Sequence, residues 1–248
     1  MDKTVAFLLR GLPRPPARVL EVGCGRGEVA AELAKSGYDV TAIDLDPGAI
    51  AVARRRGLRA QTVDLLSYEG GPFDGCVCVF SLHHLARLHA SIEKIRTLLR
   101  DGGRLLVSDY AWEAADRSTA SWMYDTLRVL VSAGAAAAPK RLPAPEESPL
   151  AFWHERHRGD EPEHPGRTML MAIRRGFVVE RFERVPYLHQ NLAGHVSGRR
   201  SDAVYQSLLE IERRRIREGS LQPLGIHVVA RRRVGRSPAV RPRSPRSR

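Results

Sequence analysis

The sequence has few cysteines, few lysines and no long run of apolar residues. Its three cysteines, Cys24, Cys76 and Cys78, form neither a disulfide framework nor the spacing of a zinc finger. Two of them lie in an apolar, strand-like run, which favours a reducing interior. Near the N-terminus, the apolar stretch 5–9 is too short for a signal peptide or a membrane span. We therefore expect a cytoplasmic protein with no membrane partner.

The sequence also has little net charge outside its C-terminal segment. It contains 40 basic and 28 acidic residues, which gives a net charge of +12. Residues 231–248 hold eight arginines and no acid, so the net charge of residues 1–230 is only +4. The segment 231–248 is rich in Arg, Pro and Ser, and we predict that it forms a disordered tail. Because the charge is concentrated there, we do not favour a nucleic-acid partner, although RNA binding through the tail stays an alternative.

Apolar strand patterns alternate with helical patterns through the first 110 residues. This alternation predicts a doubly wound α/β fold with a mostly parallel sheet and helices on both faces. Asp46 before Pro47 indicates a helix start, while Gly37 and Gly57 indicate helix ends. The expected strands are 17–22, 38–44, 58–63, 73–80 and 103–110, and the expected helices are 28–37, 46–56 and 86–100.

The pattern changes after Tyr110. A helical segment at 116–133 leads into a Pro-rich loop, and all three tryptophans lie between positions 112 and 153. We therefore predict that residues 110–176 form a helical lid inserted after the fifth strand of a domain that spans 1–230. A strand-like segment at 176–188, a helix from about Asp202 to Gly219 and a last strand at 225–232 complete the expected order.

Three glycines, Gly23, Gly25 and Gly27, follow the first strand and lead into a helix. Ligands bind at the carboxyl ends of strands in such sheets, and glycine allows a ligand to approach the main chain closely. Asp44, at the end of the second strand, is placed to accept hydrogen bonds from both hydroxyls of a ribose. A dinucleotide site would need a glycine where the sequence has Glu28. The loop therefore predicts another ligand that carries a ribose.

Four segments resemble the ordered motifs of class I S-adenosylmethionine-dependent methyltransferases. Residues Glu21 to Gly27, E-x-G-x-G-x-G, resemble the first motif, and "VTAIDLDPGAI" resembles the second. "TVDLLSYEGGPFDGCVCVFSLHHL" resembles the stretch that follows, and "LLRDGGRLLVSD" resembles the entry to strand five, with Asp101 where the family has proline. The resemblance covers residues 18–109 and implies a seven-stranded, Rossmann-like fold.

The resemblance also implies a cofactor site for S-adenosylmethionine. In it, Asp44 would hold the ribose, Leu45 would flank the adenine, Asp64 would reach the adenine amino group and Leu65 would offer its amide. Glu21 and Gly27 would shape the glycine loop. The cofactor-binding residues predicted in this way are Glu21, Gly23, Gly25, Gly27, Asp44, Leu45, Asp64, Leu65 and Phe80.

The implied activity is in-line methyl transfer to a small molecule. The motifs of nucleic-acid amino-methylating enzymes and of pyrimidine C5 enzymes are absent, and no acid follows the fourth strand to hold magnesium with Asp109. His83, His84 and His157 are the candidates for a proton-accepting role, and packing or capping at a helix start is the alternative for the first two. A non-catalytic regulator that binds a metabolite on the same fold, or an RNA-modifying protein, remains a second possibility.

The segment "FWHERH" brings two histidines three residues apart in the predicted lid. Its neighbourhood has the residue types of a metal site, but arginines and a proline interrupt the set, and we predict no metal. The candidates weighed and set aside are His154, Glu155, His157, Glu161 and His164. Trp153 or His157 could instead contact a planar or apolar acceptor, or the aromatic residues could form the lid's own core.

Overall fold

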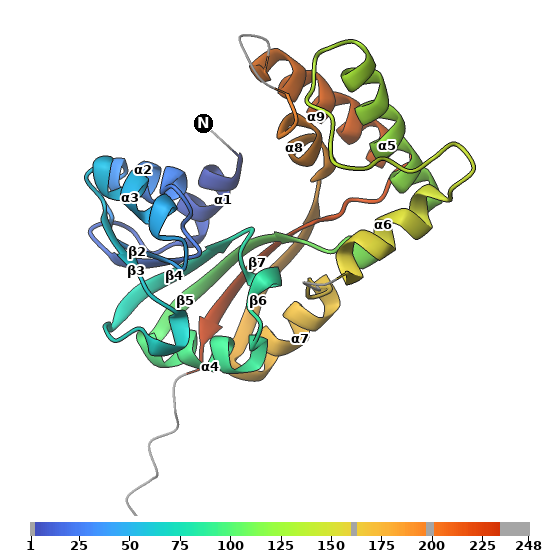
Figure 1. Ribbon diagram of the computed structural model, residues 1–248. Coiled ribbons are helices and arrows are strands. Elements are labelled where there is room, and N and C mark those ends of the chain that lie inside the picture. Colours follow the sequence, from blue (N-terminus) through green and yellow to red (C-terminus); the bar gives the residue numbers. More distant parts are fainter. Residues whose placement is uncertain (1–2, 160–162, 197–200, 234–248) are drawn as a thin grey trace, which may run out of the picture.

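The structure is a computed structural model that describes residues 3–159, 163–196 and 201–233. It contains one seven-stranded sheet in the order β3-β2-β1-β4-β5-β7-β6, in which β7 runs antiparallel to both of its neighbours. The predicted doubly wound, mostly parallel fold is therefore confirmed (Figure 1). The strands are β1 (Arg18–Val22), β2 (Asp39–Asp44), β3 (Arg59–Thr62), β4 (Phe73–Val79), β5 (Leu99–Tyr110), β6 (Phe177–Val185) and β7 (Gly225–Arg232).

Helices cover both faces of the sheet because successive strand side chains point to opposite sides. On one face, α1 (Lys3–Gly11), α2 (Glu28–Lys35) and α3 (Pro47–Arg55) bury a cluster that includes Val19 of β1. On the other face, α4 (Leu88–Leu98) and α7 (Gly166–Gly176) bury a cluster that includes Leu20 of the same strand. Figure 1 shows these two layers with the sheet between them. Helix α1 was not predicted from the sequence.

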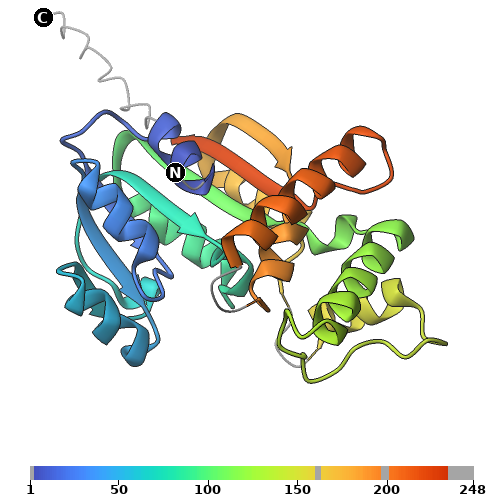
Figure 2. The ribbon, with the colours of Figure 1, turned by 90° about the horizontal axis from the view of Figure 1, so that it is seen from above.

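Four further helices form a separate group, which we call the cap. They are α5 (Arg117–Ser132), α6 (Pro149–Arg158), α8 (Leu188–Ala193) and α9 (Ser201–Arg217). Tyr124, Trp153 and Leu208 are among the residues that pack into one hydrophobic cluster shared by these helices. The cap gathers beside the carboxyl-terminal end of β5, as both ribbon views show (Figures 1 and 2).

The predicted lid, residues 110–176, and the observed cap do not contain the same helices. Helix α7 falls inside the predicted lid but packs on the sheet, because Met169, Ala172 and Ile173 join the core under α4. The cap instead takes α8 and α9, which come later in the chain between β6 and β7. The cap is therefore built from two segments, one between β5 and β6 and one between β6 and β7. The sequence analysis assigned only the first of these segments to the lid.

A buried histidine and glutamate hold α8 against α9. Glu212 is fully buried and accepts hydrogen bonds from the backbone amides of Tyr187, Leu188 and His189 at 2.8–3.0 Å. Its Oε2 also lies 2.6 Å from Nδ1 of His189, whose Nε2 lies 3.2 Å from the hydroxyl of Tyr205. Because Glu212 satisfies the first amides of α8, this contact fixes where α8 begins.

The predicted tail begins two residues too early. Arg231 and Arg232 belong to β7, where they pair with Val178 and Phe177 of β6. Both make ion pairs, Arg231 with Glu180 at 2.8 Å and Arg232 with Asp101 at 3.3 Å. Residues 234–248, which make up the rest of the predicted tail, lie outside the described residues. No helix in the described part of the chain is long and apolar enough to cross a membrane.

Candidate functional site

A cavity of about 360 Å³ opens at the carboxyl ends of β1, β2 and β4. We call it the cofactor cavity. Seven of the nine residues predicted to bind a cofactor line it: Gly23, Gly25, Asp44, Leu45, Asp64, Leu65 and Phe80. Ser81 and His84, from the segment after β4, also line it. The size falls in the range of about 300–1,000 Å³ that small-molecule sites commonly have.

The glycine loop follows the edge of this cavity in backbone conformations that other residues rarely adopt. The φ angles of Gly23, Gly25 and Gly27 are +70°, +52° and +79°. A Cβ on Gly23 would lie 2.4 Å from Cβ of Ser81, so this glycine allows the loop to touch the segment after β4. A Cβ on Gly25 would meet nothing within 4 Å. The main chain of Gly25 is therefore exposed to the open cavity, where a ligand can approach it closely.

The carboxylate of Asp44 holds this loop in place. Its Oδ2 accepts a hydrogen bond of 2.7 Å from the amide of Gly25, and its Oδ1 accepts one of 3.0 Å from the amide of Asp46. Each carboxylate oxygen can accept more than one bond, so Asp44 keeps capacity for ligand hydroxyls. Leu45, next to it, is 66% exposed although it is apolar. Bare main chain, a carboxylate and an exposed apolar side chain fit a ligand that carries a ribose and a planar ring.

Glu21 and Gly27 do not line the cofactor cavity, although they were predicted as part of its site. Side chains alternate along β1, so Glu21 points to the opposite sheet face from Val22, which does line the cavity. A Cβ on Gly27 would lie 2.5 Å from Cδ1 of Leu58, so Gly27 permits close packing of the loop against the start of β3. Gly27 therefore shapes the loop from outside the cavity, whereas the loop-shaping role of Glu21 stays a prediction.

Glu21 is almost completely buried, and one of its carboxylate oxygens has no hydrogen-bond partner among the described residues. The pKa of Glu21 is raised from 4.5 to about 8, chiefly by burial; a backbone hydrogen bond from Ala30 opposes this shift, and the nearby charges of Glu28 and Asp44 contribute to it. The folded protein therefore holds Glu21 in its neutral form at pH 7.

We expect the contribution of Glu21 to the free energy of unfolding to fall as the pH rises from about 4.5 to about 8. Below pH 4.5 Glu21 is neutral in both states, whereas above it only the unfolded chain loses the proton freely. The Glu21→Gln variant should remove this part of the pH dependence and exceed the wild type in free energy of unfolding at pH 8. Urea denaturation at pH 5 and pH 8 measures both effects, and an equal pH dependence in the two proteins would refute the assignment.

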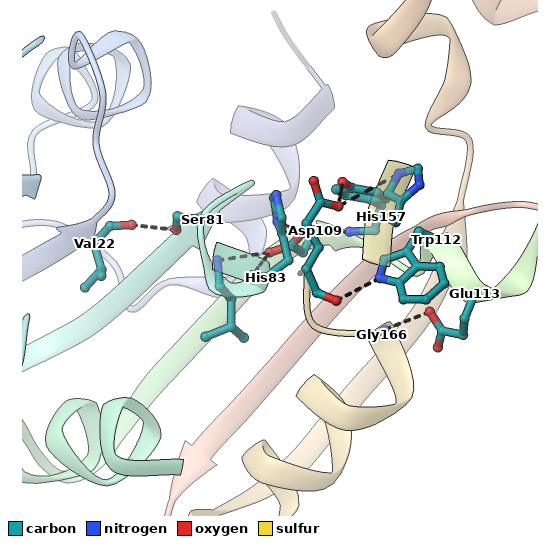
Figure 3. A network of polar contacts seen from close by, with 11 residues as sticks. Val22, Ser81, His83, Asp109, Trp112, Glu113, His157 and Gly166 are labelled. Atoms are coloured by element: carbon teal, nitrogen blue, oxygen red, sulfur yellow. Dashed lines mark hydrogen bonds and ion pairs between the residues drawn. The ribbon is translucent and has the colours of Figure 1, made fainter. Parts of the chain in front are cut away.

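Asp109, at the end of β5, fixes the short helix η2 (Leu82–His84) that follows β4. Its Oδ2 accepts hydrogen bonds from the amides of Leu82 and His83 at 3.1 and 3.3 Å. Its Oδ1 lies 2.7 Å from Nδ1 of His83 and accepts a bond of 2.9 Å from the amide of Tyr110. Asp109 and His83 are both buried, and Figure 3 shows them at the centre of a polar network. The pair holds the segment that closes the cofactor cavity.

The three candidate histidines lie in different surroundings. His84 is exposed and lines the cofactor cavity, whereas His83 is buried behind it with its ring 3.9 Å from that of His84. His157 is buried in the cap, where its Nδ1 contacts the carbonyl of Trp153 at 2.6 Å and its ring stacks on Trp112. Burial lowers the pKa of His157, so its imidazole is neutral at pH 7. Neither His83 nor His157 lines the cofactor cavity.

The three tryptophans pack in or against the hydrophobic cluster that the cap helices share. Trp112 and Trp153 are 3% and 2% exposed, and the indole of Trp153 donates a hydrogen bond of 2.9 Å to the carbonyl of Trp112. Trp122 packs against the same cluster. Of the two readings open from the sequence, the structure supports packing within the cap, because the contacts of Trp153 and His157 lie inside that core.

Three of the residues weighed as metal ligands near "FWHERH", namely Glu155, His157 and His164, have separate partners. Glu155 pairs with Arg141 at 3.7 Å, and Nε2 of His164 lies 2.9 Å from the carbonyl of Leu85. Glu161 lies outside the described residues. Within the described ranges, His83, His84 and Glu163 bring their ligand atoms within 4.8 Å of one another, a grouping that the sequence did not reveal. The hydroxyl of Tyr110 already donates to Glu163, and the absence of a metal stays a prediction.

Comparison with known proteins agrees with this geometry. A family model described as "Methyltransferase domain" matches residues 1–134, more than half of the chain. The chain belongs to this methyltransferase family. The resemblance to class I S-adenosylmethionine-dependent enzymes is thereby confirmed, and S-adenosylmethionine is the cofactor of that family.

Individual relatives match only part of this chain or show the fold alone. A ubiquinone biosynthesis O-methyltransferase of Xylella fastidiosa is 41% identical over 111 residues, which are 41% of this chain and 45% of that protein. The chain thus spans less than half of that relative. An S-adenosylmethionine-dependent methyltransferase from Mesorhizobium loti has a TM-score of 0.56 at 19% identity, covering 92% of this chain and 96% of that one.

The fold by itself does not decide the reaction. A structure described as the [4+2]-cyclase SpnF matches with a TM-score of 0.58 at 19% identity, and the match covers 94% of this chain and 82% of that one. One architecture therefore occurs with differently named activities, and the reaction has to be argued from the site.

Proposed function

We propose that this protein transfers a methyl group from S-adenosylmethionine to a small molecule. The observation that carries the proposal is the wall of the cofactor cavity, where the bare main chain of Gly25 faces open space between the Asp44 carboxylate and the exposed Leu45. Asp44 would accept hydrogen bonds from the ribose hydroxyls, and Leu45 would cover one face of the adenine. Asp64 and Leu65 would contact the edge of the adenine.

When bound, S-adenosylmethionine supplies a methyl group on a positively charged sulfur, which a nucleophile attacks in line with the breaking bond. Because the donor is already activated, the residues of this chain mainly orient the two reactants and exclude water. Asp109 and His83 hold the segment with Ser81 and His84 at the cavity edge. The cap, in this proposal, acts as the lid over the acceptor.

A proton acceptor is needed only for an acceptor molecule whose nucleophilic group keeps its proton at neutral pH. Of the three candidate histidines, we propose His84 for this role, because it is exposed at the cofactor cavity. His83 would act on the reaction through its position only, since its Nδ1 is held by Asp109 and its ring is buried.

Two measurements on the purified full chain test the proposal. Calorimetry with S-adenosylhomocysteine tests the cofactor site, and failure to bind would refute the proposal. Incubation with methyl-tritiated S-adenosylmethionine and a small-molecule cell extract tests the reaction, and we expect label in a product that is absent without protein. Binding without any transfer of label would favour the non-catalytic regulator instead.

Gly25 and Gly57 offer a matched pair of variants for the cofactor site. Both have positive φ, +52° and +80°, and a Cβ on either would meet nothing within 4 Å. Alanine at either position should therefore cost a similar backbone strain of about 1–2 kcal/mol. Only Gly25→Ala places its methyl group in the cofactor cavity, so we expect it to weaken S-adenosylhomocysteine binding by roughly tenfold or more. Calorimetry should give the wild-type affinity for Gly57→Ala, and equal losses in both variants would contradict the site.

A further inference from the structure

A second cavity, of about 340 Å³, adjoins the cofactor cavity. We call it the inner cavity. Residues of α1, β5, β7 and α9 and the connection from β6 to α8 line it. Phe80 lines both cavities, so the two spaces share a wall. The φ angle of Phe80 is +48°, a conformation that costs energy for a non-glycine residue and that is common at functional sites.

Three cationic side chains surround the inner cavity from two sides. Lys3 and Arg10 lie on one face of α1 together with Ala6, at the spacing that places residues on the same side of a helix. Arg213 reaches the cavity from α9. All three are exposed, and none of them makes an ion pair with a described residue. The convergence of α1 and α9 brings together charges that lie more than 200 positions apart in the chain.

The two acidic residues that line the inner cavity, Asp109 and Glu183, interact with groups other than its three cations. Asp109 accepts hydrogen bonds from three backbone amides and contacts His83, while Glu183 pairs with Arg181 at 3.5 Å. His227 also lines the cavity, where burial lowers its pKa to about 4 and leaves the imidazole neutral at pH 7. The lining therefore holds three cationic side chains against two acids, and both acids have other partners.

The remainder of the wall is largely apolar and aromatic. Phe80 and Tyr187 lie with their ring centroids 5.7 Å apart, and Val185 and Leu209 continue this surface. A cavity with apolar walls and a few converging charges is typical of a small-molecule site. Arginine in particular binds carboxylate and phosphate groups through paired N–H donors.

We propose that the inner cavity is the acceptor site and that its acceptor carries an anionic group, a carboxylate or a phosphate, held by Lys3, Arg10 and Arg213. This inference rests on the proposed methyl transfer. The anionic group anchors the acceptor at the side formed by α1 and α9, and the nucleophilic atom of the acceptor reaches the junction of the two cavities beside Phe80, where it can attack the methyl group. The shared wall places the acceptor next to the cofactor cavity.

The test uses the full chain saturated with S-adenosylhomocysteine and three probes: benzoate, its uncharged analogue benzamide, and inorganic phosphate. We expect benzoate or phosphate to bind in calorimetry, with affinity that falls as salt rises, and benzamide to bind at least roughly tenfold more weakly than benzoate. Benzamide that binds as well as benzoate, or binding of neither anion, would overturn the proposal.

Variants on α1 and α9 distinguish binding at this site from a general effect of surface charge. Arg213→Gln and Arg10→Gln should weaken anion binding by roughly fivefold or more, whereas Arg217→Gln, one turn further along α9 and outside the cavity lining, should not. Equal losses in Arg213→Gln and Arg217→Gln would refute a specific site. If Arg10→Gln or Arg213→Gln weakened S-adenosylhomocysteine binding instead, the cations would serve the cofactor, and the acceptor assignment would be wrong. Failure of the wild type to bind S-adenosylhomocysteine would refute the proposed function itself.

Discussion

The Asp109→Asn variant is expected to lose about 3–5 kcal/mol of its free energy of unfolding. The wild-type carboxylate is buried and receives only hydrogen-bond donors: the amides of Leu82 and His83 at one oxygen, and the amide of Tyr110 at the other. An asparagine has an NH₂ group in place of one of the two oxygens. In either orientation of the side chain, this NH₂ group would face backbone N–H donors, either those of Leu82 and His83 or that of Tyr110. At least one buried amide would then lose its partner, and the contact with His83 would weaken.

The same variant is expected to bind S-adenosylhomocysteine more weakly, because Asp109 fixes the segment that carries Ser81 and His84 at the cofactor cavity. Urea denaturation measures the stability, and calorimetry at a temperature where the variant is folded measures the affinity. Asp101→Asn is a suitable control, since Asp101 is 60% exposed in its pair with Arg232 and should change the stability by less than about 1 kcal/mol. If the two variants were equally stable, Asp109 would not have the structural role assigned to it.

The first half of the fold could be predicted because its signals are local. The side chain of Asp46 caps α3 by accepting from the amide of Gly48, and Gly37 and Gly57 adopt the positive φ that helix ends require. Alternating apolar patterns marked the strands on either side. The cofactor cavity followed from this order, because a parallel sheet brings the ends of β1, β2 and β4 together.

The second half depends on pairings between distant residues, which leave no local signal. His189 and Glu212 lie 23 positions apart, and neither belongs to a motif, yet their contact fixes α8 against α9. Likewise, Glu113 accepts from the amides of Gly166 and Arg167 and so caps α7 across 53 positions. That cap places α7 on the sheet and not in the lid (Figure 3). The composition of residues 110–176 indicates helices but not which surface each helix covers.

The inner cavity illustrates the same limit. Lys3 and Arg213 have no sequence feature that distinguishes them from the other basic residues of this arginine-rich chain. Their convergence depends on α1 packing beside β5 and on α9, a helix of the cap, reaching the same cavity. The excess basic charge of the sequence is concentrated in residues 231–248, whereas the cations that meet at the inner cavity come from α1 and α9.

The Asp44→Ala variant is expected to weaken cofactor binding by about 1–3 kcal/mol, roughly five- to 150-fold in the dissociation constant. Two effects contribute to this loss. The variant removes the acceptor proposed for the ribose hydroxyls, and it also leaves the amides of Gly25 and Asp46 without the carboxylate that holds them at 2.7 and 3.0 Å. The glycine loop would then sample other conformations, so that part of the binding energy is needed to order it again.

Asp46→Ala separates the cofactor contact from loop damage. Asp46 lies in the same turn but does not line the cofactor cavity, and its side chain caps α3 through the amide of Gly48 at 2.7 Å. Its loss should lower the stability by about 1 kcal/mol and leave the affinity for S-adenosylhomocysteine close to that of the wild type. Calorimetry on the two variants decides between the alternatives. An unchanged affinity in Asp44→Ala would refute the carboxylate's role at the ribose, whereas equal losses in both variants would assign the effect to the loop, because only Asp44 reaches the cavity.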